Sequence, residues 1–216
     1  MSESVPLLGL FAGSVQDRWP GKAPSAIGKT AIPSGQVTQT GLTQDAQADL
    51  SVHGGLGKAL HVYPADHYAA WQIDLGDNIR FQPGGFGENL STPGWSEQDV
   101  CIGDIWQIGT TRLQISQGRQ PCWKLAEHVG DKRMVKLVRQ TGRTGWYLRV
   151  LDEGEITVGD TVTRIDRPHP EFSVARVAAA IFDKRTPEDE VRTIANLSEL
   201  DESWRHALLK RVEAKA

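Results

Sequence analysis

Alternating apolar and polar positions recur through the first three quarters of the chain. This period of two is typical of half-buried strands, because successive side chains of a strand point to opposite faces of a sheet. Glycine and proline clusters separate the runs, as they do at turns. The pattern predicts strands over residues 5–13, 26–32, 35–39, 59–63, 99–116 (with a turn at Gly109), 145–151 and 156–165.

Two short segments within this β-rich part have helical spacing instead. In residues 64–75, Pro64 stands at the first helical position, and Tyr68, Trp71 and Leu75 share a face. Residues 131–140 end before a glycine, which favours a helix C-terminus. We therefore expect a mostly β body with short helices on its surface, closed into a barrel so that no strand edge is exposed.

The pattern changes to helical after residue 167. Three amphipathic segments follow, at residues 173–183, 187–196 and 202–214. The chain is thus predicted to be a β-rich α+β protein with one domain over residues 1–167 and a small three-helix appendage over 168–216. The appendage carries nearly balanced charge without a basic stripe, so docking or homodimer formation suits it better than DNA binding.

Composition narrows the classes of function. The 216 residues carry a net charge of −3, with 24% charged and 39% hydrophobic residues, which is ordinary for a soluble globular protein. This balance does not favour a nucleic-acid partner. No stretch approaches the roughly 20 apolar residues that cross a bilayer, so no membrane span is expected. Two cysteines do not make a disulfide framework, which favours a reducing compartment and predicts a cytoplasmic protein.

Cys122 is the first candidate for chemistry. It lies in the segment SQGRQPCWKL (residues 116–125), between Arg119 and Lys124, just after a predicted strand and before a predicted helix. Neighbouring cations favour the thiolate, which attacks electrophiles and binds metals. The alternative is that Cys122 is a small apolar filler. The second cysteine, Cys101, lies in an alternating run without an adjacent cation, and we interpret it as structural.

Two glycine-rich loops are further candidates. Residues 41–58 are too long and irregular for a hairpin loop, and loops of that length are often functional. At their centre, Gly54 and Gly55 follow His53, and such glycines let backbone N–H groups approach a ligand. A plain turn is the alternative. In the second loop, residues 83–92, Glu88 and Asn89 either contact a ligand or cap the turn.

Five blocks in order resemble one known family: QADLSVHGGLGKAL, FGENLST, DVCIGD, SQGRQPCWKL and GWYLRVLDEG. They are similar to the MOSC domain, named after the C-terminal domain of molybdenum cofactor sulfurase, and to its YiiM branch, which carries a C-terminal three-helix extension. The resemblance covers essentially the whole chain. It implies a distorted, mostly antiparallel β-barrel that binds molybdenum cofactor (molybdopterin) and reduces N-hydroxylated compounds such as hydroxylaminopurine base analogues.

The resemblance also assigns residues. Cys122 is similar to the metal-ligating cysteine, and His53, Lys58, Arg119 and Lys124 match positions near the cofactor cleft. His53 could donate a proton or be a structural turn residue. Further cofactor contacts are expected from residues of the same loops and strands, namely Gly54, Gly55, Asn89 and Arg149. Arg143 is a further candidate to bind the cofactor phosphate, alongside Lys58, Arg119, Lys124 and Arg149.

The chain departs from the family motif at two glycines. Gly118 stands where proline is expected, and Gly57 stands where an acidic residue often precedes Lys58. Neither change removes a candidate ligand. We expect both to loosen the loops around the site.

Three functions remain open from the sequence. The first is a molybdenum-dependent reductase of small N-hydroxylated substrates, with Cys122 as the metal ligand. The second is a sulfur carrier with a persulfide on Cys122, and the third is a non-catalytic carrier of the cofactor. Because no iron–sulfur cysteine set or nucleotide fingerprint is visible, a reductase would need a separate electron-donor protein.

Overall fold

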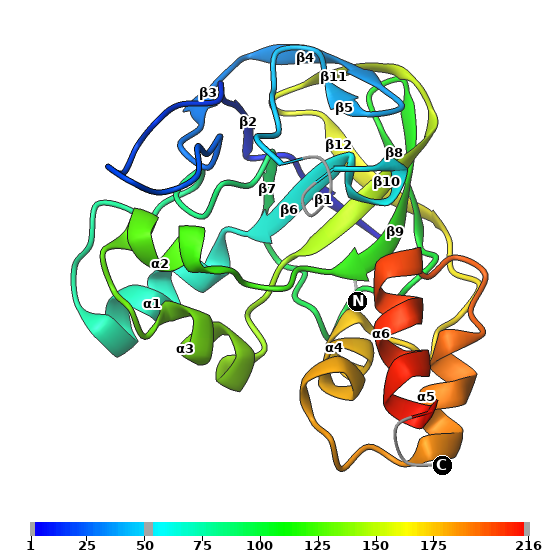
Figure 1. The fold of residues 1–216 in the computed structure, drawn as a ribbon. Coiled ribbons are helices and arrows are strands. Elements are labelled where there is room, and N and C mark those ends of the chain that lie inside the picture. Colours follow the sequence, from blue (N-terminus) through cyan, green and yellow to red (C-terminus); the bar gives the residue numbers. More distant parts are fainter. Residues whose placement is uncertain (1–2, 50–53, 214–216) are drawn as a thin grey trace.

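A computed structural model describes residues 3–49 and 54–213 of the chain. A curved sheet occupies one part of the molecule, and six helices lie against it in two groups of three (Figure 1). Helices α1 to α3 form one group, and helices α4 to α6 form the other near the C-terminus. The β-rich α+β class and the three C-terminal helices are therefore confirmed.

The main sheet contains nine of the strands in the described residues. All neighbouring pairs are antiparallel except β6 with β7. In order across the sheet, the strands are β1 (Ser4–Pro6), β12 (Thr161–Asp166), β8 (Ile105–Ile108), β9 (Thr111–Gly118), β10 (Trp146–Asp152), β6 (Leu60–Pro64), β7 (Leu90–Thr92), β2 (Gly9–Ala12) and β3 (Thr30–Ala31). A smaller sheet consists of β11 (Gly154–Thr157), β4 (Ser34–Thr38) and β5 (Gly41–Leu42).

The predicted closure into a barrel is not observed, because the main sheet does not close on itself strand to strand within the described residues. Its two ends are nevertheless linked, because β1 and β2 belong to one N-terminal segment. The N–H of Leu7 donates to the Asp160 carbonyl at 2.9 Å, and the next N–H, from Leu8, donates to the Ser91 carbonyl at 2.9 Å. The segment thus passes from β12 at one side of the sheet to β7 at the other, and the sheet curls like a barrel with an imperfect seam.

Several predicted boundaries were wrong. Residues 5–13 form two strands, β1 and β2, residues 26–32 contain only the short β3, and residues 156–165 divide into β11 and β12. Helix α1 (Asp66–Leu75) begins two residues after Pro64, which instead pairs with Thr92 at the end of β6. Strand β8 begins only at Ile105, because residues before it turn around Gly103, whose φ of 88° favours glycine. The predicted helical faces hold, since Tyr68 and Trp71 are buried.

Helices α2 (Trp123–Val129) and α3 (Met134–Thr141) pack beside α1. A short 3-10 helix (Leu56–Lys58) precedes β6. The predicted end of α3 is confirmed, because Gly142 is left-handed and its N–H donates to the Val138 carbonyl.

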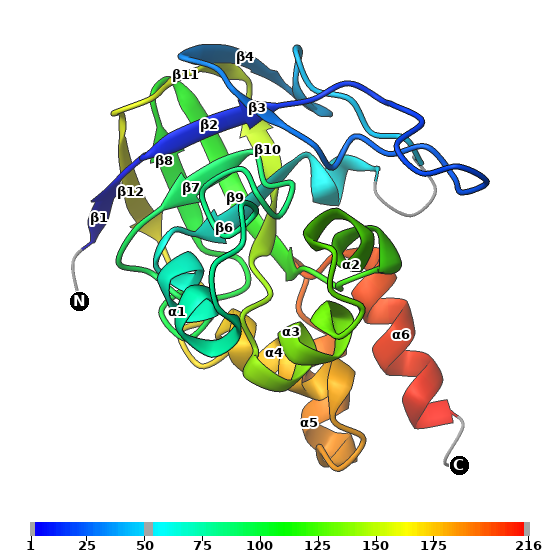
Figure 2. The same ribbon diagram turned by 90° about the vertical axis from the view of Figure 1, so that its left-hand side faces the viewer.

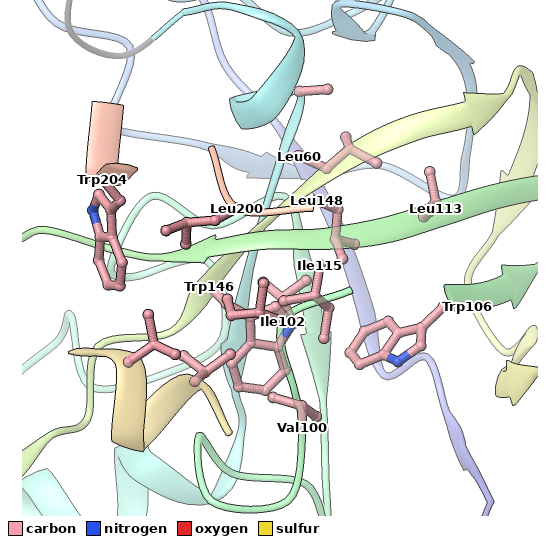
Figure 3. Close-up of a cluster of buried hydrophobic side chains, with 14 of the residues drawn as sticks. Leu60, Val100, Ile102, Trp106, Leu113, Ile115, Trp146, Leu148, Leu200 and Trp204 are labelled. Atoms are coloured by element: carbon pink, nitrogen blue, oxygen red, sulfur yellow. The ribbon is translucent and has the colours of Figure 1, made fainter. Parts of the chain in front are cut away.

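The C-terminal helices share the core of the sheet. They are α4 (Val174–Phe182), α5 (Glu188–Ala195) and α6 (Glu202–Glu213). Trp204 of α6 belongs to the same buried apolar cluster as Ile115 of β9 and Leu148 of β10 (Figure 3). The apolar faces of the helices are thus buried within the chain, and a docking or dimer-forming role stays a prediction.

None of the helices in the described part of the chain is long and apolar enough to cross a membrane.

Candidate functional site

One cleft gathers most of the candidate residues. It contains about 650 Å³ of empty space, counting its open mouth. One side is lined by Arg119, Gln120, Cys122 and Lys124, from the end of β9 to the start of α2. Tyr147 of β10 and His61 of β6 line it as well. The opposite side consists of the N-terminal loops, residues 25–29 and 45–48.

Five of the predicted site residues meet in this cleft: Lys58, Asn89, Arg119, Cys122 and Lys124. Among the described residues of its lining, Gly54, Gly55 and Arg149 are not found. His53 lies outside the described residues. Arg143 is engaged elsewhere, because it pairs with Asp74 at 2.6 Å and lies 4.7 Å from the Trp71 ring centroid.

Cys122 stands where an extended segment becomes helix α2. Its φ of −123° and ψ of 171° are extended, and the helix begins at the next residue. Its side chain is half-buried at the cleft and is not part of a disulfide. This confirms the predicted position after a strand and before a helix, and it leaves the thiol reachable from the cleft.

Cys101 has a different environment. It is only 2% exposed, and its thiol donates to the Pro170 carbonyl at 3.5 Å. Burial, together with the nearby carboxylate of Asp104, raises the pKa of Cys101 to about 11. A buried thiol that keeps its proton agrees with the structural interpretation.

Two buried cations flank the thiol. Arg119 and Lys124 are 6% and 7% exposed. The backbone N–H of Arg119 donates to the Gly145 carbonyl at 3.0 Å, which fixes the chain at this point, whereas its side-chain Nη1 has no hydrogen-bond partner among the described residues. An unpartnered guanidinium nitrogen in a cleft is costly unless a ligand accepts from it, and an anionic ligand suits it best.

His61 lies beside Arg119 and was not predicted from the sequence. It is 4% exposed, and its Nε2 has no hydrogen-bond partner within the described part of the chain. Burial, followed by the positive charge of Arg119, holds the pKa of His61 well below its ordinary value. His61 is therefore neutral at physiological pH.

Tyr147 was also missed. Its ring centroid lies 5.1 Å from that of His61, and both residues line the cleft. Burial raises the pKa of Tyr147, with Arg119 opposing and Cys122 reinforcing the change. The phenol therefore carries its proton across the neutral range. In the sequence, Tyr147 and His61 are ordinary members of alternating strands, so nothing there marks them as site residues.

A polar network forms the opposite side of the cleft. Asp45 accepts hydrogen bonds from Lys29, from the Gly13 N–H at 2.7 Å and from the Asn89 amide at 2.8 Å. The side-chain oxygen of Asn89 in turn accepts from the backbone N–H of His61 at 3.0 Å. Burial lowers the pKa of Lys29, although Asp45 opposes this. Asn89 thus both lines the cleft and ties the loops to β6.

Glu88, the residue before Asn89, stabilises the loop instead of contacting the cleft. It is fully buried and accepts from the Tyr68 hydroxyl and the Gly84 N–H, both at 2.6 Å. Burial raises the pKa of Glu88, with these hydrogen bonds opposing. Glu88 therefore holds the glycine-rich loop and does not line the cleft.

The two glycines that depart from the family motif both face the C-terminal helices. A Cβ on Gly118 would lie 2.7 Å from the Trp204 ring, and a Cβ on Gly57 would overlap the Asp201 carboxylate. Both glycines are thus sites of close contact. This differs from the expectation that they loosen the loops.

Among residues 3–49 and 54–213, no group of three or more His, Cys, Asp and Glu side chains is arranged to hold a metal ion. A metal bound to these residues of the cleft would therefore need most of its ligands from a cofactor, with the Cys122 sulfur as the soft protein ligand.

Comparison with known proteins agrees with this geometry. The MOSC domain model matches residues 49–163, and the model of the YiiM-like 3-alpha helix domain matches residues 173–214. YiiM of Escherichia coli is 32% identical over 204 residues, which are 94% of this chain and 90% of that protein. The crystal structure of YiiM from Geobacillus stearothermophilus has a TM-score of 0.82 at 31% identity, covering 96% of this chain and 99% of that one.

A protein named reductase from Gibberella moniliformis is 40% identical over 144 residues, which are 66% of this chain but only 26% of that protein. The MOSC model covers more than half of the 216 residues, and the helical extension matches separately. The chain therefore belongs to the MOSC domain family, as a YiiM-like member.

Proposed function

We propose that this protein is an oxidoreductase that holds molybdenum cofactor in the cleft through Cys122 and reduces N-hydroxylated, hydroxylaminopurine-like compounds to amines. The observation that carries the proposal is the half-buried Cys122 thiol in a cleft beside two buried cations, Arg119 and Lys124. Family membership and the relative named reductase support the same class of activity.

The residues of the cleft fit the cofactor. A metal held by a dithiolene accepts one protein thiolate, which matches a site with a single thiol and no protein ligand cluster among the described residues. The unpartnered Nη1 of Arg119 can donate to an anionic group, and Lys58 and Lys124 add positive charge. Asn89 also lines this space, whereas Gly54, Gly55 and Arg149 remain predicted contacts without this support.

The reaction needs two electrons, protons and an acceptor for the departing oxygen. The bound cofactor would supply the electrons and take up the oxygen, and a separate electron-donor protein would reload it. The chain itself must bind the substrate, exclude bulk water and deliver a proton near the oxygen.

We assign proton delivery to the Tyr147 hydroxyl. It carries a proton at neutral pH and lines the cleft with Cys122. His61 is neutral and buried, so it suits the role of orienting Tyr147 through ring contact. His53, the donor expected from the ordinary pKa of histidine, stays a second candidate.

The test is to express the protein in a host that makes the cofactor, and to measure molybdenum content and hydroxylaminopurine reduction with a reduced viologen dye. We expect about one molybdenum per chain in the wild type and background levels of metal and activity in Cys122→Ser. Cys101→Ser is the matched control and should keep both.

Tyr147→Phe separates proton delivery from cofactor binding. It should keep its molybdenum while kcat falls by about 100-fold, the low end of the range for general acid catalysis. Retained metal and activity in Cys122→Ser would contradict the proposal. A sulfur adduct on Cys122 in the intact mass, in place of metal, would favour the persulfide carrier, and bound metal without turnover would favour the cofactor carrier.

A further inference from the structure

A second cluster of positive charge lies at the far end of α2 from Cys122. Its centre is His128, in the last turn of α2 and 9% exposed. The N-terminal loop before β3 lies near α2 (Figures 1 and 2), and the ring centroid of Trp19, the residue after Arg18, lies 5.6 Å from that of Trp123 at the start of α2. Arg80 approaches from the loop after α1, where the Asn78 amide donates to the carbonyl of Val129, the residue after His128, at 3.0 Å.

The Arg18 side chain packs against the backbone of Gly28. Its Nη2 donates to the Gly28 carbonyl at 3.1 Å. A Cβ on Gly28 would overlap the Arg18 guanidinium, so the missing side chain lets this group lie against the loop. The guanidinium is thus held in position by a neutral acceptor, and its charge is not cancelled there.

Several side-chain nitrogens of the cluster lack hydrogen-bond partners. Arg18 Nε, His128 Nε2 and Arg119 Nη1 are buried without hydrogen-bond partners in the described residues. Buried polar groups without partners are rare in proteins and call for an explanation. Arg119 also lines the cleft, so it connects the cluster to the site of Cys122.

The acidic residue beside His128 does not neutralise it. Glu127, next to His128, pairs with Lys22 at 2.6 Å. The environment of His128 agrees with an uncompensated positive field, because burial, followed by Arg80, Arg18 and Arg119, lowers its pKa to about 4. Arg18 and Arg80 are partly exposed, so an anion can reach them from solvent.

We propose that Arg18, Arg80 and His128, with Arg119 on the cleft side, bind a phosphate-type oxyanion. Guanidinium groups suit the tetrahedral oxygens of phosphate because they present several N–H donors in a fixed plane. The phosphate could belong to a nucleotide form of the N-hydroxylated substrate or to the cofactor. This assignment of its source rests on the proposed function, whereas the anion site itself does not.

The first test is a titration of the full-length protein with inorganic phosphate and pyrophosphate, followed by calorimetry at constant ionic strength with chloride as the reference. We expect saturable binding that weakens by about tenfold or more in Arg18→Gln and in Arg80→Gln, since each removes a charged hydrogen-bond donor. Arg133→Gln is the matched control, because Arg133 lies just after α2 and already pairs with Asp131. It should bind phosphate as the wild type does.

Two readouts then identify the source. If the substrate brings the phosphate, Arg18→Gln raises KM for hydroxylaminopurine ribonucleoside 5′-monophosphate and leaves KM for the free base unchanged. If the cofactor brings it, Arg18→Gln lowers the molybdenum content of the purified protein. Both results support the site.

The site is overturned if the wild type binds neither phosphate nor pyrophosphate above the chloride reference. It is also overturned if folded Arg18→Gln and Arg80→Gln bind as well as Arg133→Gln does. Failure of the proposed reductase function would leave this titration unaffected, so the two outcomes are distinguishable.

Discussion

The two walls of the cleft are built in different ways. The first, here the β9–α2 wall, comprises residues 119–124 with Tyr147 beside them, and it joins regular elements. Helix α6 supports it from behind, where the Asp201 N–H donates to the Ser116 carbonyl at 2.9 Å and Ser203 bonds to Gln117 at 3.0 Å. The second, here the loop wall, comprises residues 25–29 and 45–48 and has little regular structure.

The difference lies in what holds each wall in place. Backbone pairing and apolar packing position the β9–α2 wall, so its position depends on many separate contacts. The loop wall depends on one buried polar group, Asp45, with its partners Lys29, Asn89 and Gly13. A single substitution should therefore damage the loop wall more than the β9–α2 wall.

The largest effect is expected from Asp45→Ala in the loop wall. The side chains of Lys29 and Asp45 are 6% and 8% exposed, so the substitution leaves a buried ammonium without its closest counter-charge. Breaking a buried pair in this way costs about 3–5 kcal/mol of unfolding free energy. Urea denaturation monitored by tryptophan fluorescence measures it.

The matched control replaces both partners. Lys29→Met with Asp45→Leu removes both charges and should recover the part of the lost free energy that comes from the unpaired ammonium, although the Gly13 N–H and the Asn89 amide still lose their acceptor. A loss below about 1 kcal/mol in Asp45→Ala would place this pair among the weak surface ion pairs. The contrast between the two walls would then fail.

The same contrast explains what the sequence could predict. The β9–α2 wall follows a strand with period two and leads into a helix, so the placement of Cys122, Arg119 and Lys124 could be inferred. The loop wall has no periodicity, and Lys29 and Asp45 are polar residues in irregular segments. Their pairing across 16 residues is a tertiary contact that no local pattern reveals.

His61 and Tyr147 were missed for another reason. Both lie in strands that were predicted correctly, but alternation says only that neighbours point to opposite faces. It does not say which face lines a cleft. That depends on how the sheet curls and on the loops that cover it, which the N-terminal segment and its hydrogen bonds to Asp160 and Ser91 decide.

The second largest loss of unfolding free energy is expected from Gly118→Ala, which tests whether α6 supports the β9–α2 wall. In Gly118→Ala the new methyl group would lie 2.7 Å from the Trp204 ring and 3.3 Å from Val174, both of which are buried. Overpacking of this kind costs about 1–3 kcal/mol. Because many contacts share the load, we expect the lower half of this range, measured by the same denaturation.

A second variant shows whether Trp204 is the cause. Trp204→Phe leaves more room for the methyl group, so Gly118→Ala should cost less in that background than in the wild type. Equal costs in the two backgrounds would mean that α6 does not press on β9 at this point.

The smallest effect concerns His128, a buried residue in the last turn of α2. Its pKa of about 4 lies below the ordinary 6.5, so the unfolded chain binds the proton more readily between these values. Stability contributed by the neutral imidazole is therefore present at pH 7 and is lost as the pH falls below about 6.5. Relative to His128→Gln, the wild type should lose about 1 kcal/mol of unfolding free energy between pH 7 and pH 5, a value that allows for residual solvent contact. Denaturation curves at both pH values measure this loss. If the wild type and His128→Gln lose the same unfolding free energy between the two pH values, no net positive field acts on His128.

Saturating phosphate should reduce the loss, because a bound anion favours the imidazolium, and it should do so in the wild type but not in Arg18→Gln.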